Sequence, residues 1–462
     1  MLLMLGGCCL TTVSGEASSY RAASSGGFTP TGGAPTGGET TLGGGGATGT
    51  AAPTSGGSSS GGGTAEGSTS GGGGVTSGAS TTSAGSCVPA TASNLRSEAS
   101  YGQSIATSAM VSGDINGDGL LDLVVAESVE FYEEAADFVV FLGQADGGLS
   151  APEVPDRDGG LSAPDASFVG NGTAIALADL DNNGWPDVIV SFGANIHVFL
   201  NEGGEKLNDT AFVQTLHEVF GIGIGDLNGD GFEDLVLAEY ENTGAGAIEL
   251  VFGSGSGGFS APVLLPGVGG TRFPNLVVAD LNQDGLPDIA TNTSDGSQLA
   301  VLLNQGDGGF MTTLYPTPVT AQLALLPRAG TAPDLIVGTV QLGSFEQSGT
   351  VQILKNSGDG HFSIGPSYTA PGAMFFAVGD FNGDCIPDIA TSVFWNCQML
   401  GSGISVLYGD GQGGFEPPVS LQAVGSATAG LAVLGPIGSP RALAVVDACG
   451  AGVTVYGDAS QH

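Results

Sequence analysis

Oxygen-bearing side chains recur at alternate positions in short, glycine-rich segments of this sequence. In the segment GDLNGDGFEDLVL these residues are Asp226, Asn228, Asp230 and Asp234. Alternate side chains of a tight loop point inward together, and a calcium ion takes six to eight oxygen ligands at about 2.3–2.6 Å. Gly231 supplies a backbone bend that a Cβ would hinder, and the carbonyl of Phe232 is placed to be a further ligand. The segment predicts a calcium loop that leads into a buried strand, the apolar run LVL.

The same spacing occurs four more times, each time before an apolar strand. A single copy would equally suit an ordinary solvated turn, but five copies in register favour a metal-binding repeat. The other predicted side-chain ligands are Asp114, Asn116, Asp118 and Asp122; Asp179, Asp181, Asn183 and Asp187; Asp280, Asn282, Asp284 and Asp288; and Asp380, Asn382, Asp384 and Asp388. The predicted carbonyl ligands are Leu120, Trp185, Phe232, Leu286 and Ile386.

A second motif, a short strand followed by a Gly/Asp-rich turn, gives an independent measure of the repeat. Its seven copies begin at Phe138, Ile196, Ile248, Leu299, Val351, Ile404 and Val453, at spacings of 58, 52, 51, 52, 53 and 49 residues. Two units, near Asp334 and near Arg441, keep the flanking strands but have lost the loop carboxylates. Repetition at such a period indicates a solenoid or a propeller. We therefore expect seven units, five of them with a calcium loop.

From about residue 88 to the C-terminus, these loops and strands resemble the FG-GAP/VCBS repeats of integrin α-subunits. The resemblance rests on the D-x-[ND]-x-[ND]-G-x-x-D loop followed by an apolar strand. It implies an all-β fold, a seven-bladed β-propeller, with calcium held by loop positions one, three, five, seven (through the carbonyl) and nine. Units five and seven depart from the pattern and should be metal-free. Cys385 replaces the loop glycine in unit six, which should weaken that site.

Composition divides the chain into three parts. Residues 1–9 resemble a signal or lipobox segment, and residues 10–86 are almost all Gly, Ser, Thr and Ala. Such a composition buries too little apolar surface to offset its ordering entropy, so we expect a disordered tether. Residues 87–462 should form the propeller. Its last unit is one strand short, and we expect residues 95–103 to complete that blade and protect its edge.

The amino terminus suggests how the protein is located. Leu5-Gly6-Gly7-Cys8 resembles the bacterial lipobox, which implies lipidation of Cys8. No basic residue precedes the short apolar run, so a misplaced start codon or a truncated secretory signal are alternatives. We expect an exported protein, either an outer-membrane or cell-surface lipoprotein or a secreted one. Contact with a membrane is expected only through the lipid anchor.

The formal net charge of −38 bears on the choice of partner. So acidic a chain is not expected to bind nucleic acids or anionic membrane surfaces, because like charges repel. Calcium would offset only part of this charge. A solubilising surface explains the rest most simply, while a saline habitat or a cationic ligand remain open.

A group of aromatic and acidic residues should lie on the face opposite the calcium loops. These candidate ligand-binding residues are Phe131, Tyr132, Glu133, Glu134, Tyr240, Phe394 and Trp395. They come from turns between the second and third strands of a blade, which share one end of a propeller. Such residues could hold a glycan or a protein at the cell surface. Local packing or exposure to water is the simpler explanation of their position.

The residues that catalysis needs do not form a recognisable pattern. The four histidines are scattered, no Ser/His/Asp pattern is evident, and the G-x-G string at Gly221 has no following helix. We therefore interpret the protein as a calcium-binding module for ligand binding or adhesion. The alternatives are a calcium-dependent carbohydrate-active enzyme, a lyase or hydrolase on a propeller, and a purely structural surface protein.

Apart from Cys8 and Cys9, the chain has four cysteines, and all of them lie in the predicted propeller. Export of the chain would favour disulfides between them. Cys385 precedes the second strand of unit six and Cys397 follows it. The strand between them spans roughly 23 Å, far beyond the ~7 Å Cα separation that a bridge allows. Cys449 follows the equivalent strand of unit seven, on the same side as Cys397. The topology thus predicts the pairs Cys397–Cys449 and Cys87–Cys385.

Overall fold

The described residues of this computed structural model are all β-strand, turn or loop. They belong to the second of two compact units, Ala65–His462. They are residues 69–71, 95–101, 107–127, 138–145, 148–155, 161–162, 174–203, 206–240, 246–265, 268, 276–293, 297–317, 322–340, 348–371, 373–392, 403–421, 428–436, 442–447 and 452–458. Among them, no helix is long and apolar enough to cross a membrane.

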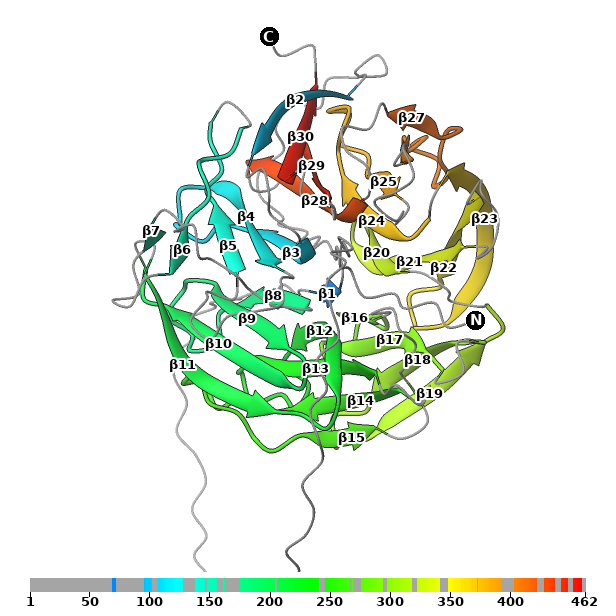
Figure 1. The fold of residues 1–462 in the computed structure, drawn as a ribbon. Helices are drawn as coiled ribbons and strands as arrows, with labels where there is room; N and C mark the ends of the chain where they lie inside the picture. The colour runs from blue at the N-terminus through cyan, green and yellow to red at the C-terminus, as the bar shows by residue number, and fades with distance from the viewer. Residues whose placement is uncertain are drawn as a thin grey trace, which may run out of the picture. The chain divides into compact units, whose positions relative to one another are not determined.

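Seven antiparallel blades of described residues form a closed ring around a centre (Figure 1). The innermost strand of each blade contacts the innermost strand of the next, and the last contacts the first. In ring order these strands are β3 (Thr107–Gly113), β8 (Ala174–Ala178), β12 (Glu218–Gly225), β16 (Leu276–Ala279), β20 (Leu323–Arg328), β24 (Phe375–Gly379) and β28 (Thr428–Pro436). This arrangement confirms the predicted all-β fold with seven units.

Blades two to six each contain four strands that run outward in chain order. Beyond β8, blade two has β9 (Asp187–Phe192), β10 (Asn195–Asn201) and β11 (Leu207–Gln214), and beyond β12, blade three has β13 (Asp234–Tyr240), β14 (Gly246–Val251) and β15 (Val263–Leu265). Blade four continues with β17 (Asp288–Asn292), β18 (Leu299–Asn304) and β19 (Phe310–Tyr315), and blade five with β21 (Thr331–Val340), β22 (Ser348–Asn356) and β23 (Phe362–Pro371). Blade six continues with β25 (Asp388–Ser392), β26 (Ile404–Leu407) and β27 (Val419–Leu421). The short β1 (Thr69–Gly71) pairs with the inner edge of β12, although it lies within the segment 10–86 that was expected to be a disordered tether. The rest of that segment lies outside the described residues.

The ring closes between blades seven and one. Blade one contains β3, β4 (Leu120–Glu127) and β5 (Phe138–Phe141), with the small pair β6 (Val154–Pro155) and β7 (Leu161–Ser162) beside it. Blade seven contains β28, β29 (Ala442–Asp447), β30 (Gly452–Asp458) and β2 (Leu95–Tyr101). An N-terminal strand, β2, therefore lies outermost, paired with the last strand of the chain. This pairing satisfies a strand edge that would otherwise be open.

The hydrophobic core lies in the seams between neighbouring blades. On β13, Leu235 and Leu237 pack into the seam with blade two, whereas Val236 and Ala238 pack into the seam with blade four. A middle strand is thus buried on both faces, which explains why it reads as a continuous apolar run. Removing these side chains from water is the main force that holds one blade against the next.

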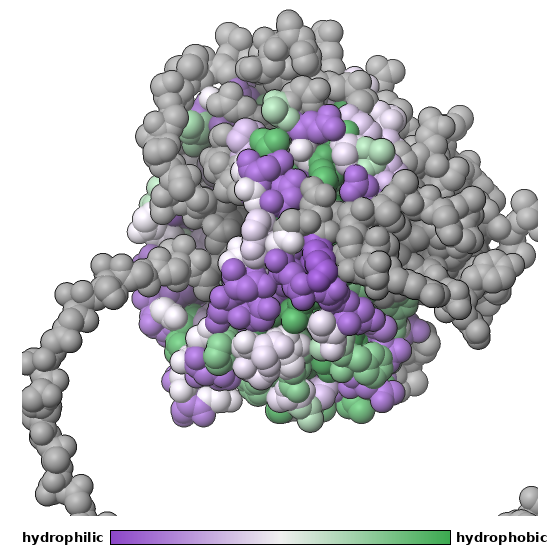
Figure 2. All heavy atoms as spheres, turned by 90° about the vertical axis from the view of Figure 1, so that its left-hand side faces the viewer, coloured by the Kyte–Doolittle hydropathy of each residue, from purple (hydrophilic) through white to green (hydrophobic). Residues whose placement is uncertain are grey.

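The two ends of each strand carry different loops. β13 begins at Asp234 in the calcium-loop pattern and ends at Tyr240, which pairs with Glu218 at the start of β12. We call the end of the ring where β13 begins, at Asp234, the loop end, and the end where β13 finishes, at Tyr240, the opposite end. Seen from the side, hydrophilic side chains gather in the middle of the surface, with apolar ones among and below them (Figure 2). Outer strands contribute some of the exposed apolar groups, such as Phe212 and Ile364.

Candidate metal centre

The five aspartate-rich loops share one backbone shape. We call them loop 1 (114–122), loop 2 (179–187), loop 3 (226–234), loop 4 (280–288) and loop 6 (380–388). In each, the fourth and sixth residues have positive φ, as at Asn182 (57°) and Gly184 (91°) in loop 2. Glycine fills most of these positions because it adopts positive φ without steric cost. The three exceptions are Asn182, Gln283 (64°) and Cys385 (65°). Cys385 therefore adopts the bend of the glycine that it replaces.

The first aspartate of a loop organises the turn. In loop 3, Asp226 Oδ1 accepts hydrogen bonds from the backbone N–H groups of Gly229 (2.7 Å) and Asp230 (3.0 Å). Its Oδ2 accepts another from Gly231 at 2.8 Å. Asp114 and Asp380 make the same three bonds in loops 1 and 6. The chain thus folds around this carboxylate through local contacts alone, which is why the pattern is visible in the sequence.

The ninth aspartate clamps the loop to the blade. Asp234 is fully buried, and its Oδ2 accepts from the N–H of Leu227 at 2.9 Å. Its Oδ1 accepts from the N–H of Gly253, at the end of the third strand, at 2.8 Å. Equivalent buried clamps are Asp122, Asp187, Asp288 and Asp388. From the sequence these residues were predicted only as metal ligands, because the hydrogen-bond partner near the end of the third strand lies outside the local motif.

Burial shifts the acid–base behaviour of these clamps. Desolvation raises the pKa of Asp187 and Asp388 from 3.8 to about 7, against the lowering effect of the two backbone hydrogen bonds. The same causes raise the pKa of Asp122, Asp234 and Asp288 to about 6. The other aspartates of each loop raise it further by repulsion. A cation in the loop would lower the pKa of the clamp aspartate. Metal binding and protonation of the clamp should therefore oppose each other.

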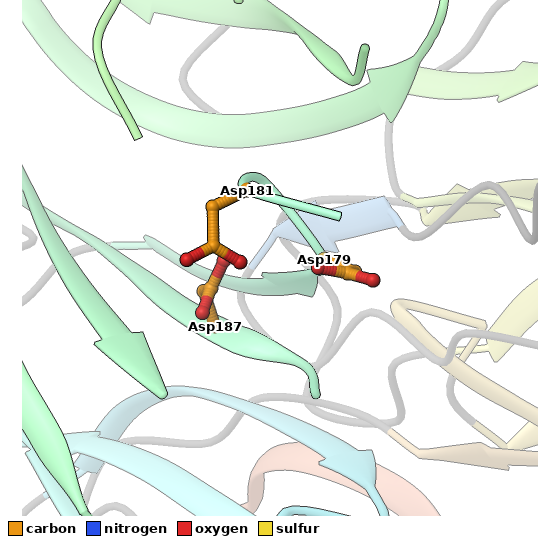
Figure 3. A group of neighbouring side chains, drawn as sticks. All are labelled: Asp179, Asp181 and Asp187. Atoms are coloured by element: carbon orange, nitrogen blue, oxygen red, sulfur yellow. The ribbon is translucent and has the colours of Figure 1, made fainter. Parts of the chain in front are cut away.

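Loop 2 brings three carboxylates together. Oxygens of Asp179, Asp181 and Asp187 lie within 4.8 Å of one another, and the three could hold a metal ion (Figure 3). An all-oxygen set with three negative charges suits a hard cation such as calcium. Asp187 is the buried clamp, while the other two are half-buried and reachable from solvent.

The other loops carry an asparagine at the third position, which changes the local contacts. In loop 3, Asn228 Nδ2 donates to Asp230 Oδ2 at 3.0 Å, and Asn282 makes the equivalent bond to Asp284 at 2.9 Å in loop 4. A cation that bound both side chains through oxygen would have to replace this bond. The ligand sets of loops 1, 3, 4 and 6 therefore stay predictions.

Blade five differs from the expectation that its unit had lost the carboxylates. Asp334 retains the clamp position: it is fully buried, and its Oδ1 accepts from the N–H of Asn356 at 2.8 Å. Arg328 Nη1 lies 3.1 Å from Oδ1, and Lys355 Nζ lies 3.0 Å from Oδ2. Two side-chain cations thus neutralise this buried carboxylate. This ion pair was not predicted from the sequence, because Arg328 and Lys355 lie on β20 and β22, outside the loop motif.

The remaining predicted site residues are only partly described. Tyr240 lies half-buried at the opposite end, with its ring 6.0 Å from that of Phe220 in an edge-to-face contact. Cys385 takes part in a disulfide. The other candidates, namely Phe131, Tyr132, Glu133, Glu134, Phe394, Trp395, Cys8, Cys87, Cys397 and Cys449, lie outside the described residues. Both cysteine pairings therefore stay predictions.

A buried pair of glutamates near the opposite end was also missed. Glu239 and Glu249 are each 1% exposed, and Glu239 Oε2 lies 3.3 Å from His217 Nδ1. Glu239 Oε1 and Glu249 Oε2 have no hydrogen-bond donor. Burial and the facing Glu249 raise the pKa of Glu239 to about 7, although His217 opposes the shift. Burial and repulsion from Glu249 therefore favour the protonated form of Glu239.

We expect Glu249→Gln to stabilise the calcium-saturated protein at pH 8 but hardly at pH 5. Because the pKa of Glu239 in the folded protein is above the usual 4.5, the stability that its proton supplies is full at low pH and is lost as the pH rises towards about 7. A glutamine donates an N–H at every pH, so the gain at pH 8 should be on the order of 1 kcal/mol. Thermal unfolding at both pH values measures it, with the exposed Glu218→Gln as control. Equal effects of Glu249→Gln at the two pH values would contradict the protonation of Glu239.

Comparison with known proteins agrees with the geometry of the ring. A family model described as "FG-GAP-like repeat" matches residues 114–190, 179–237 and 226–291. Integrin alpha-3 of Mus musculus is 33% identical over 138 residues, which are 26% of this chain and 12% of that protein. Integrin alpha-7 of Homo sapiens is 33% identical over 141 residues, again 26% of this chain and 12% of that protein. The chain therefore spans about an eighth of the length of these relatives.

Solved structures resemble the chain more distantly. The beta-propeller domain of Cps50 (Swd1) from Myceliophteria thermophila has a TM-score of 0.46 and 10% identity, with coverage of 79% of this chain and 99% of that one. A lectin from Agrocybe aegerita that recognises non-reducing terminal N-acetylglucosamine has a TM-score of 0.44 and 19% identity, with coverage of 69% and 81%. These likenesses are too distant to indicate a ligand.

The fold class is thus a β-propeller-like ring of seven antiparallel blades. Within it, residues 114–291 carry FG-GAP-like repeats that are similar to those of integrin α-subunits. Loop 2 holds an acidic group that could bind a metal ion.

Proposed function

We propose that this protein is an exported calcium-binding propeller that presents a ligand-binding surface, as an adhesion or recognition module does. The observation that carries the calcium part is the common geometry of five loops. Each has two left-handed residues at the same positions, a first aspartate that organises the turn and a buried ninth aspartate. An oxygen ligand set such as the three carboxylates of loop 2 suits calcium, which accepts variable geometry, better than magnesium.

The chemistry of blade five supports the same proposal. Where the loop is missing, Arg328 and Lys355 neutralise the clamp carboxylate of Asp334. A buried carboxylate needs a compensating charge. In the five blades with loops, the described residues place no such pair of cations on the clamp. A metal ion supplies the charge that these blades lack.

The ligand part of the proposal rests on the division of the ring into two ends. With calcium at the loop end, the opposite end is free to carry ligand-specific residues, and Tyr240 lies there. A glycan or a protein at the cell surface is the class of partner that such an exported module would bind. Attachment through a lipid on Cys8, followed by the Gly/Ser/Thr-rich tether, would hold the ring away from the membrane.

The number of calcium ions bound per molecule tests the calcium-binding part of this proposal. After removal and replacement of metal, equilibrium dialysis of the full chain should give about five calcium ions per molecule. Asp181→Ala removes a half-buried ligand of loop 2 and should lower the count by one, while the exposed Asp307→Asn should leave it unchanged. A count that is zero, or that does not respond to Asp181→Ala, would exclude loop 2 as a calcium site.

The ligand is tested by the same protein on a glycan array and against cell-surface extracts, with and without calcium. Binding that is lost on Tyr240→Ala, with unchanged calcium content, would locate the ligand at the opposite end. Binding that survives this change and is lost with Asp181→Ala would place it at the loop end instead.

A further inference from the structure

Three buried asparagines connect neighbouring blades at the loop end. They stand at the end of the third strand in blades two, four and five: Asn201, Asn304 and Asn356. In each, the backbone N–H donates to the clamp aspartate of its own blade, at 2.7–2.8 Å. In each, Nδ2 donates to the carbonyl of the second loop residue in the preceding blade, at 2.7–2.8 Å.

In blades three to five these contacts form one continuous chain of hydrogen bonds. The clamp of loop 3 accepts from the N–H of Leu227, whose carbonyl accepts from Asn304. Asn304 N–H donates to Asp288, the clamp of loop 4. The same sequence of bonds continues through Leu281 and Asn356 to Asp334. There the chain ends on an ion pair with Arg328 and Lys355, which needs no metal.

Glycine replaces the asparagine in the other blades with loops. Gly143, Gly253 and Gly409 keep the backbone bond to their own clamp but have no side chain to reach the preceding blade. At Gly253 a Cβ would lie 2.2 Å from the carbonyl oxygen of Glu233, so no side chain fits there. The chain of bonds is therefore interrupted before blades one, three and six.

We propose that Asn304 couples calcium binding in loops 3 and 4, and that Asn356 ties loop 4 to the permanent ion pair of blade five. This inference rests on the proposed calcium function. An ion in loop 4 orders Asp288, which holds Asn304 and thereby the carbonyl of Leu227 in loop 3. Coupling of this kind is reciprocal: each ion strengthens the binding of the other. Loop 6 lies outside the chain of bonds and binds independently.

A double-mutant cycle tests the coupling. Asp280→Ala disables loop 4, and Asn304→Gly installs the residue that blades one, three and six carry naturally. Hydrogen exchange of the peptide that contains residues 226–237 is followed in the full chain against free calcium, so the midpoint for loop 3 is read separately. One buried hydrogen bond corresponds to about fivefold in affinity. Asp280→Ala should raise the loop 3 midpoint about fivefold with Asn304 present, and should have no further effect with Gly at this position.

Two further variants complete the design. Asp380→Ala disables loop 6 and should leave the loop 3 midpoint unchanged. Asn356→Gly should raise the midpoint of the peptide that contains residues 280–292 about fivefold. The coupling is overturned if Asp280→Ala shifts loop 3 equally in both backgrounds or in neither. No response of the 226–237 peptide to calcium in the unaltered chain would overturn the proposed calcium function as well, which separates the two failures.

Discussion

Removal of calcium is expected to lower the melting temperature of this protein strongly, and more strongly at pH 8 than at pH 5. An ion that binds only the folded state stabilises it by about 2.7 kcal/mol per site at a hundredfold excess over Kd. Five loops would together contribute a large part of the stability of a single ring. Without metal, the carboxylates of each loop repel one another while one of them is fully buried.

The pH dependence follows from the five clamps. In the metal-free fold their pKa values are about 6 or 7, above the usual 3.8. The folded state then holds protons that the unfolded state has released, so stability falls as the pH rises from about 4 to about 7. Bound calcium keeps these carboxylates ionised and removes this loss. The difference in melting temperature between the calcium-loaded and the calcium-free protein should therefore be larger at pH 8 than at pH 5.

The measurement is differential scanning calorimetry of the full chain. Metal is removed with chelator at pH 8, and the protein is then exchanged into calcium-free buffer at each pH. Asp187→Asn abolishes one titrating clamp and should narrow the difference, whereas the exposed Asp307→Asn should not. Identical melting with and without calcium, with metal content verified, would refute the coupling of folding to calcium.

The double variant Arg328→Met/Lys355→Met should destabilise the protein by about 3–5 kcal/mol, because it leaves Asp334 as a buried, unpaired charge. Asp334 is 1% exposed on its side chain, and among the described residues the N–H of Asn356 would be the one hydrogen-bond donor left for its carboxylate. Lys355 also donates to the carbonyl of Gly413 at 2.7 Å, so its loss would loosen the contact with blade six. The effect should appear both with and without calcium, since no metal is involved.

Lys206→Met is the matched control, because Lys206 is the other lysine of the chain. It pairs with Glu202 at the surface, where both side chains are substantially exposed. Exposed pairs of this kind contribute about 0–1 kcal/mol. Chemical denaturation measures the free energy of unfolding of the unaltered protein, the double variant and Lys206→Met. If the double variant lost no more stability than Lys206→Met, the ion pair would not replace a metal in blade five.

Much of this protein is determined by local patterns in its sequence. The first aspartate of each loop bonds to backbone groups only three to five residues away. Middle strands such as β13 are buried on both faces and so appear as apolar runs. The number of units and the positions of the loops could therefore be predicted from spacing, whereas the all-β propeller fold was predicted from the resemblance to FG-GAP/VCBS repeats.

Contacts between distant residues were decided only by the tertiary structure. Asn304 lies 77 residues from the carbonyl that it binds, and Asn356 lies 75 residues from its own. In blade three, the buried pair Glu239 and Glu249 comes from two different strands. In blade five, the two cations that contact Asp334 also come from two different strands. A repeat motif specifies each blade but not which polar side chains meet when blades stack. The clamps, the ion pair and the links between loops depend on that packing, because burial and closure of the ring bring their partners together.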